Sequence, residues 1–209
     1  MRCRQALLTI NNLTLAYIVL LACARPGAKL PPSMESEQTS RGIRVADCEG
    51  PAVSLPSSLR AQLAPRTGKM VPDDHWADLA EQIPGGFAGV LYSNGKPVLM
   101  LTHPELAATA KKALASDRTL VGFDVMHAEV RTARWDFAQL VDWYNYFVGH
   151  TTVWNTVGIV SGDKDESTNR IHFGIENETG RETLTKKLVA LKVPCDLIRI
   201  SIESPIRLL

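Results

Sequence analysis

One order of short segments occurs twice in this 209-residue chain. Residues 156–175 form two alternating apolar runs around a polar turn, residues 179–192 have helical spacing, and residues 196–204 alternate again. Residues 87–130 show the same order of two strands, a helix and a strand. A hairpin with one helix is barely stable, whereas a third strand lets the helix cover one face of a small sheet. The repeated order therefore predicts two small ββαβ units.

The first repeat contains a strong hairpin signal. Asn94 and Gly95 separate its two apolar runs, and a type I′ turn needs residues that accept positive φ at both central positions. Thr102 and Glu105 have the spacing of a capping box, which predicts the start of a helix. The alternation in residues 119–130 predicts the third strand. One face of that strand would carry Val121, Phe123 and Val125.

The second repeat has the same signals. A polar turn at residues 163–169 joins its first two strands, and Thr179 with Glu182 forms a second capping box. The third strand is predicted in residues 196–204. The apolar positions expected to face the core are Ile171, Phe173, Ile175, Leu184, Leu188, Leu191, Ile198, Ile200 and Ile202.

A tryptophan-containing helix precedes each repeat. Asp73 or Asp74 can cap the first helix, and Asp136 can cap the second, residues 134–147, with Gln139 reaching back. The chain is therefore predicted to be an α+β protein of two tandem ββαβ units. Each unit is expected to be an antiparallel three-stranded sheet with helices on one face.

The domain boundaries follow from this organisation. The predicted segments are a signal peptide at 1–22, a disordered linker at 23–70, a first α-ββαβ unit at 71–134, a connecting helix at 135–155, and a second ββαβ unit with a C-terminal tail at 156–209. The linker is predicted because residues 24–70 are rich in Pro and Ser and have no sustained period.

The first 22 residues indicate export. Arg2 and Arg4 give a basic start, and residues 13–22 form an apolar run that is too short for a comfortable membrane span. Leu20 to Cys23 resembles the lipobox of bacterial lipoproteins, although Leu21 stands where a small residue is usual. Cys23 is thus either a lipid anchor in the cell envelope or an ordinary residue near a conventional cleavage site.

Composition narrows the classes of partner. An apolar content of 45% is enough for a real core, and the net charge is only +1. A nearly neutral chain has no strong electrostatic attraction for nucleic acid or for acidic membranes, so the only membrane contact predicted is a lipid on Cys23. Cys48 and Cys195 could pair or stay free, and no two cysteines have zinc-ligand spacing.

No segment has the pattern of an enzyme site. None of the five histidines stands in a recognisable nucleophile setting, and no phosphate-binding Gly loop occurs. Residues 163–169 have the alternating oxygen spacing of a calcium loop, but Thr168 stands where Gly is needed and Gly174 where Glu is needed. The sequence therefore predicts a protein that is not an enzyme and that needs no cofactor or metal.

The second repeat resembles the pro-region module of secreted bacterial serine proteases of the alpha-lytic protease and streptogrisin kind. That pattern is an acidic turn, Asn-Arg or Asn-Lys, an alternating strand, a helix, Gly-Pro or Val-Pro, and a final strand rich in Val and Ile. The matching positions are Asp165, Asn169, Arg170, Ile171, Phe173, Ile175, Val193, Pro194, Ile198 and Ile200. Residues 85–102 are similar to the preceding segment of such chains.

The resemblance implies a function in binding. Pro-regions of this family bind the protease, help it to fold and then inhibit it, with an added sheet strand and a tail in the active-site cleft. A chain of this kind would contact a trypsin-like serine protease, or another extended polypeptide, through an exposed sheet edge. The contacting tail would consist of Ile206, Arg207, Leu208 and Leu209.

One departure from the family leaves alternatives open. The protease domain that follows the module in the family does not follow here. The chain could therefore be an inhibitor or chaperone that acts on a separate protease, or the N-terminal fragment of a secreted serine protease. A third alternative is a structural or interaction lipoprotein of the cell envelope that shares only the small fold.

Overall fold

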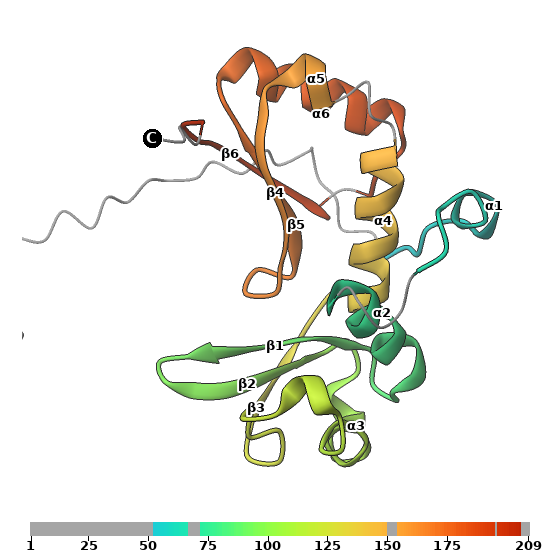
Figure 1. Ribbon diagram of the computed structural model, residues 1–209, viewed down its shortest axis with the longest axis vertical. Helices are drawn as coiled ribbons and strands as arrows, with labels where there is room; N and C mark the ends of the chain where they lie inside the picture. The colour runs from blue at the N-terminus through green and yellow to red at the C-terminus, as the bar shows by residue number, and fades with distance from the viewer. Residues whose placement is uncertain (1–51, 67–71, 150–153, 195, 206–209) are drawn as a thin grey trace, which may run out of the picture. The chain divides into compact units, whose positions relative to one another are not determined.

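The computed structural model describes residues 52–66, 72–149, 154–194 and 196–205. All of them belong to one compact unit, Thr39–Leu209. The predicted α+β class is confirmed, with two three-stranded sheets and helices (Figure 1). No helix in the described ranges is long and apolar enough to span a membrane.

The first sheet begins with the predicted hairpin. Strands β1 (Phe87–Ser93) and β2 (Lys96–Leu101) pair antiparallel around Asn94 and Gly95, whose φ angles are 52° and 73°. Both angles are positive, as the Asn-Gly signal requires. Strand β3 (Glu129–Thr132) completes the order β1-β2-β3.

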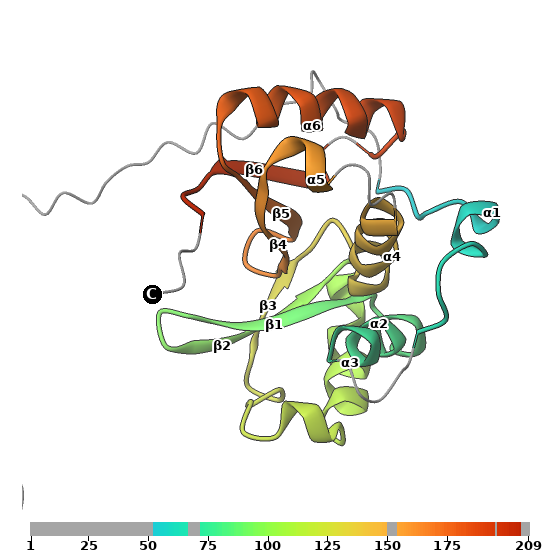
Figure 2. The same ribbon diagram turned by 45° about the horizontal axis from the view of Figure 1, so that its top comes forward.

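The second sheet repeats this plan. Strands β4 (Ile159–Asp165) and β5 (Arg170–Ile175) pair antiparallel, and β6 (Ile198–Ile202) completes the order β4-β5-β6. Helix α6 (Glu178–Ala190) connects β5 to β6, and the short helix α5 (Trp154–Val157) precedes β4. Figure 2 shows α6 lying across this sheet.

The prediction of purely antiparallel sheets is wrong in one ladder of each sheet. Strand β3 is parallel to β2, and β6 is parallel to β5. A helical crossover carries the chain back to the end where the preceding strand began, so the next strand joins parallel. The crossovers that do this are α6 in the second sheet and α3 (Ala107–Leu114) in the first.

The third strand of the first sheet is also shorter than predicted. Residues 119–128 do not form a strand. A short 3-10 helix, Arg118–Leu120, is followed by a turn in which Gly122 has a φ of 90°. Asp117 caps the 3-10 helix by accepting a hydrogen bond from the Thr119 amide at 2.8 Å. Val121, predicted to face the core, is 84% exposed, so the apolar alternation there does not reflect a strand.

Two of the three predicted capping boxes are wrong. The Thr102 hydroxyl donates to the Gly85 carbonyl, and the helical segment starts only at Pro104, because a residue before proline is driven to extended conformations. In α6 the cap is Asn177, which accepts from the Gly180 amide at 2.9 Å. Asn177 precedes the predicted Thr179 and is a preferred N-cap residue itself.

The third capping box is confirmed in helix α4 (Phe137–Gly149). The Asp136 side chain accepts from the Gln139 amide at 2.8 Å, and the Gln139 side chain accepts from the Asp136 amide at 3.0 Å. Helix α2 (Pro72–Gln82) begins before Asp73 and Asp74, which lie in its first turn. Negative charges there stabilise the helix through its dipole.

Helix α4 contributes to both hydrophobic cores. Its Phe137, Ala138 and Val141 belong to the core of the first sheet, with α2 and α3. Its Leu140, Trp143 and Phe147 belong to the core of the second sheet. In that second core the predicted inward residues Ile171, Phe173, Ile175, Leu184, Leu188 and Ile200 are buried.

Residues 52–66, here called the strap, correct the prediction of a disordered linker over 23–70. The strap contains a short helix, α1 (Ser57–Arg60), and Leu55 is buried in the core of the second sheet. The Trp143 indole donates to the Val53 carbonyl at 2.9 Å. The strap is thus attached to the second core through Leu55 and to α4 through a hydrogen bond.

Candidate functional site

Strand β6 is one of the two edge strands of the second sheet, and its free side is called the outer edge here. Among the residues that the structure describes, no strand lies beyond β6. The Ile171 amide donates to the Leu197 carbonyl, and the Glu203 amide donates to the Ile175 carbonyl, both at 2.9 Å. Odd-numbered residues of β6 therefore bond to β5, and alternation turns the backbone groups of the even-numbered residues outward. The outer edge thus consists of the N–H and C=O groups of Ile198, Ile200 and Ile202.

The side chains of β6 divide between two faces of the sheet. Ile200 is buried in the core, while Ile202 at the end of the strand is 43% exposed. Arg199, Ser201 and Glu203 have the opposite parity and lie on the other face. A strand added at the outer edge would meet apolar groups on one face and polar groups on the other.

A hydrogen-bonded polar cluster occupies this second face. It consists of Ser161 on β4, His172 on β5, and Ser201 and Glu203 on and after β6. The two serine hydroxyls donate to the Glu203 carboxylate at 2.7 and 2.6 Å. Nε2 of His172 lies 2.7 Å from the Ser201 hydroxyl. The cluster holds Glu203 and so directs the chain as it leaves the sheet.

Gly174 makes room for this carboxylate. A Cβ atom at position 174 would overlap Oε2 of Glu203 and the Ser161 hydroxyl. Gly174 pairs with Ser201 across the β5-β6 ladder and with Ser161 across the β4-β5 ladder. The absence of a side chain at this one position therefore lets Glu203 lie against the sheet.

The residue types of the cluster are those of a hydrolase triad, but the geometry differs. In a triad the carboxylate holds the imidazole through Nδ1 while Nε2 faces the serine. Here the Ser201 hydroxyl and Oε1 of Glu203 approach the same Nε2 of His172, at 2.7 and 3.5 Å. The arrangement positions the carboxylate and does not prepare Ser201 as a nucleophile.

The cluster lowers the pKa of Glu203. The largest cause is the hydrogen bond from Ser201; partial burial acts in the opposite direction, and Ser161 and the nearby His172 lower the pKa further. Because the folded-state pKa lies below the unfolded-state value near 4.5, the cluster stabilises the fold above that pH. This contribution is lost as the pH falls through the lower, folded-state pKa.

We expect Glu203→Gln to flatten the acid side of the stability profile. The native chain loses the ionised cluster on acidification, whereas the variant has no carboxylate there to protonate. Urea unfolding followed by circular dichroism at several pH values from neutral to acid would give both profiles. Glu182→Gln, at an exposed position of α6, is the matched control. If the free energy of unfolding of the native chain and of Glu203→Gln changed equally with pH, the pKa of Glu203 would not be lowered in the folded state.

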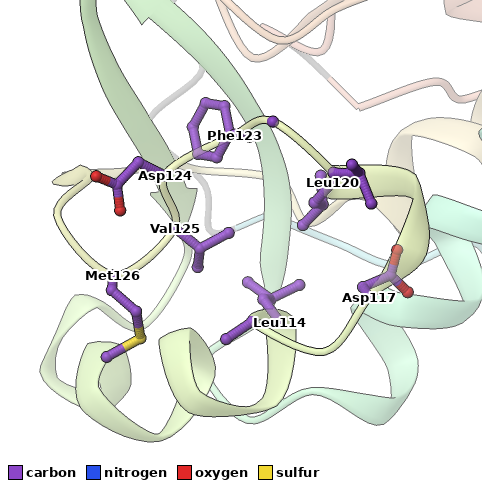
Figure 3. Close-up of a pocket in the computed structure, with 10 residues that line it drawn as sticks. Leu114, Asp117, Leu120, Phe123, Asp124, Val125 and Met126 are labelled. Atoms are coloured by element: carbon purple, nitrogen blue, oxygen red, sulfur yellow. The ribbon is translucent and has the colours of Figure 1, made fainter.

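A small hollow lies beside α3. It has a volume of about 250 Å³, and Figure 3 shows Leu114, Leu120 and Val125 pointing toward it. Its carboxylates already have partners: Asp117 lies 2.9 Å from Nε2 of His75, and Asp124 contacts His127. The hollow therefore offers apolar contact without the convergent polar groups that mark a ligand site.

The residues named from the sequence as contacts could not be placed. Cys23 and Ile206 to Leu209 lie outside the described residues, as do Cys48 and Cys195. No sequence motif predicts the polar cluster. Alternation along β6 is a signal for a shared face, but the partners on β4 and β5 depend on a register that the sequence does not specify. In the described part of the chain, no three His, Cys, Asp or Glu side chains gather as metal ligands.

Comparisons with protein-family models, with curated proteins and with solved structures gave no match to this chain. The resemblance to protease pro-regions rests only on the matching residues of the second repeat. Two of these residues have clear structural roles. Asn169 is buried and bonded to the segment before α4, and Arg170 begins β5.

Proposed function

We propose that this chain is an exported, non-enzymatic binding module that holds an extended polypeptide at the outer edge of β6. The partner we propose is a trypsin-like serine protease, which the module would inhibit or help to fold. The observation that carries this proposal is the outward-facing backbone of Ile198, Ile200 and Ile202. Main-chain groups at a sheet edge bind an added strand by the same hydrogen bonds that join strands within a sheet.

The side chains of β6 give the proposed site one apolar face and one polar face. A bound strand would place alternate residues beside Ile202 and beside Ser201. The first contact is apolar and partly exposed, and the second belongs to the polar cluster. The two different faces favour a bound segment in which apolar and polar residues alternate, which is the pattern of a strand in a protease β-barrel.

The resemblance to protease pro-regions supports the choice of partner. The matching motif includes Asn169 and Arg170, and the order of β5, α6 and β6 agrees with the strand, helix and strand of that motif. Glu203 is held by the cluster at the start of the segment that leads to residues 206–209. We propose that these four residues enter the active-site cleft while the outer edge binds a protease strand.

Titration of the purified chain into a mature bacterial serine protease of the alpha-lytic kind tests this proposal. Residual peptide hydrolysis should fall stoichiometrically. Ile202→Pro removes one outward N–H without touching the ladder to β5, so we expect inhibition to weaken about tenfold or more. Ile202→Thr keeps the N–H and the branched shape, and should inhibit within about threefold of the native chain.

The outcomes separate the two contacts. Deleting residues 206–209 should abolish inhibition but leave binding measurable by calorimetry, because the outer edge remains. A folded native chain that neither binds nor inhibits the protease at micromolar concentration would overturn the proposal and favour an envelope interaction protein. If Ile202→Pro and Ile202→Thr inhibited the protease equally, the outer edge would not be part of the binding site.

A further inference from the structure

The charges on the polar face of β6 are self-complementary when two copies of the strand lie antiparallel. Arg199 and Glu203 lie on the same face, two residues on either side of Ser201. In an antiparallel pair of two such strands centred on Ser201, Arg199 of each copy lies opposite Glu203 of the other. Opposite charges directly across a ladder stabilise the pairing.

The backbone permits this register. An antiparallel ladder alternates between pairs that exchange two hydrogen bonds and pairs that exchange none. Centring on Ser201 places Ile200 opposite Ile202, and both have outward-facing N–H and C=O groups. These two isoleucines form the hydrogen-bonded pairs, while Ser201 and the charged residues form the closer, non-hydrogen-bonded pairs.

Other registers lack the charge pairs. A shift by one pairing step places Ser201 opposite Arg199 or opposite Glu203, and no Arg-Glu pair remains. In-register parallel pairing sets Arg199 against Arg199, and like charges directly opposite each other are destabilising. The antiparallel register centred on Ser201 is thus the one that the charges of this strand select.

Glu203 can take part without leaving the polar cluster. Its carboxylate accepts from Ser161 and Ser201, and a carboxylate has about four acceptor sites. On the opposite face, the 43% exposed Ile202 would pack against Ile200 of the second copy. The pairing therefore covers a partly exposed apolar side chain and adds acceptor contacts to a group that is already positioned.

We propose that two copies of this chain pair through β6 in this antiparallel register and form a continuous six-stranded sheet. A two-fold axis perpendicular to the sheet passes between the two Ser201 residues, so both copies of α6 lie on one face. The pairing goes beyond the proposed function, because it needs no protease. It occupies the outer edge when no other strand is bound there.

Sedimentation velocity of the purified chain, with no protease present, tests the proposal. Because one short strand pair buries little area, the dimer fraction should rise over roughly 10 to 500 μM. Ile202→Pro should stay monomeric over this range and Ile202→Thr should associate. Arg199→Glu should weaken association about tenfold or more, because it places two carboxylates opposite each other.

A disulfide at the symmetry axis gives an independent measurement. Non-hydrogen-bonded antiparallel pairs bring Cβ atoms within about 5 Å, close to disulfide geometry. In a background with the four native cysteines replaced by serine, Ser201→Cys should oxidise to a covalent dimer. Ser167→Cys, in the exposed β4-β5 turn, is the control and should stay largely monomeric.

Each result bears on the proposal. Association that Ile202→Pro does not reduce would place the contact on another surface and overturn the pairing. A chain that stays monomeric throughout the concentration range, with Ser201→Cys crosslinking no better than Ser167→Cys, would also overturn it. Failure here leaves the protease proposal untouched, since a monomeric chain can still add a protease strand.

Discussion

Replacing Asn169 by alanine should destabilise the fold by about 3 to 5 kcal/mol, because the buried amide and carbonyl of Trp135 and the partly buried amide of Arg134 lose their partner. The Asn169 side chain accepts from the amides of Arg134 and Trp135, each at 2.8 Å, and donates to the Trp135 carbonyl at 2.8 Å. It is only 4% exposed. This single amide joins the β4-β5 turn to the segment that begins α4. Urea unfolding monitored by circular dichroism would measure the loss.

Asn94→Ala provides the matched control. Asn169 and Asn94 have nearly the same positive φ, 53° and 52°, but Asn94 is exposed in the first hairpin. Placing alanine in this left-handed conformation costs about 1 to 2 kcal/mol by itself. The difference between the stability lost in Asn169→Ala and that lost in Asn94→Ala therefore measures the contribution of the three hydrogen bonds. A difference near zero would show that they contribute nothing to stability.

Replacing Asp142 by alanine should destabilise the fold by about 2 kcal/mol, because it removes the nearest carboxylate of the largely buried Arg66, which then keeps only Glu81 at 3.1 Å and Asp78 at 3.5 Å. Asp142 on α4 bonds to Arg66 at 2.7 Å and to Arg60 at 2.9 Å. The side chains of Asp142 and Arg66 are only 10% and 13% exposed. The variant should also raise amide hydrogen exchange in the strap, residues 52–66, which these two arginines fasten to α4.

Glu81→Ala is the control for this second prediction. Glu81 contacts the same two arginines, but its side chain is 42% exposed. Exposed pairs contribute about 0 to 1 kcal/mol, so its loss should be small and strap exchange should stay close to native. A cost for Asp142→Ala no larger than that for Glu81→Ala would show that the strap is held by its apolar contacts alone.

The parts of the fold that were predicted are those encoded by local patterns. Asn94-Gly95 defines a hairpin through the φ angles that the turn needs, and Asp136 with Gln139 defines the start of α4 through neighbouring side chains. The parallel pairing of β3 and β6 was not predicted, because it depends on the path of the crossover. The strap is not predicted, although Leu55, Leu59 and Leu63 stand four residues apart, because the prolines and serines around them indicate a linker.

The candidate site was less predictable than the fold. Ser161, His172, Ser201 and Glu203 come from three strands, and only the ladders bring them together. The outer edge of β6 follows from strand order, which the sequence does not state. The predicted contact residues Cys23 and 206–209 were named from resemblances, and they lie outside the described residues.

Helix α4 prevents the two ββαβ units from being separated, although both units have the same order of elements. Phe137 and Val141 complete the first core, and Leu140 and Phe147 complete the second. A cut before the helix would open the core of the first sheet, and a cut after it would open the core of the second. The repeat is thus a unit of architecture but not a unit that can be excised, exchanged or inherited alone.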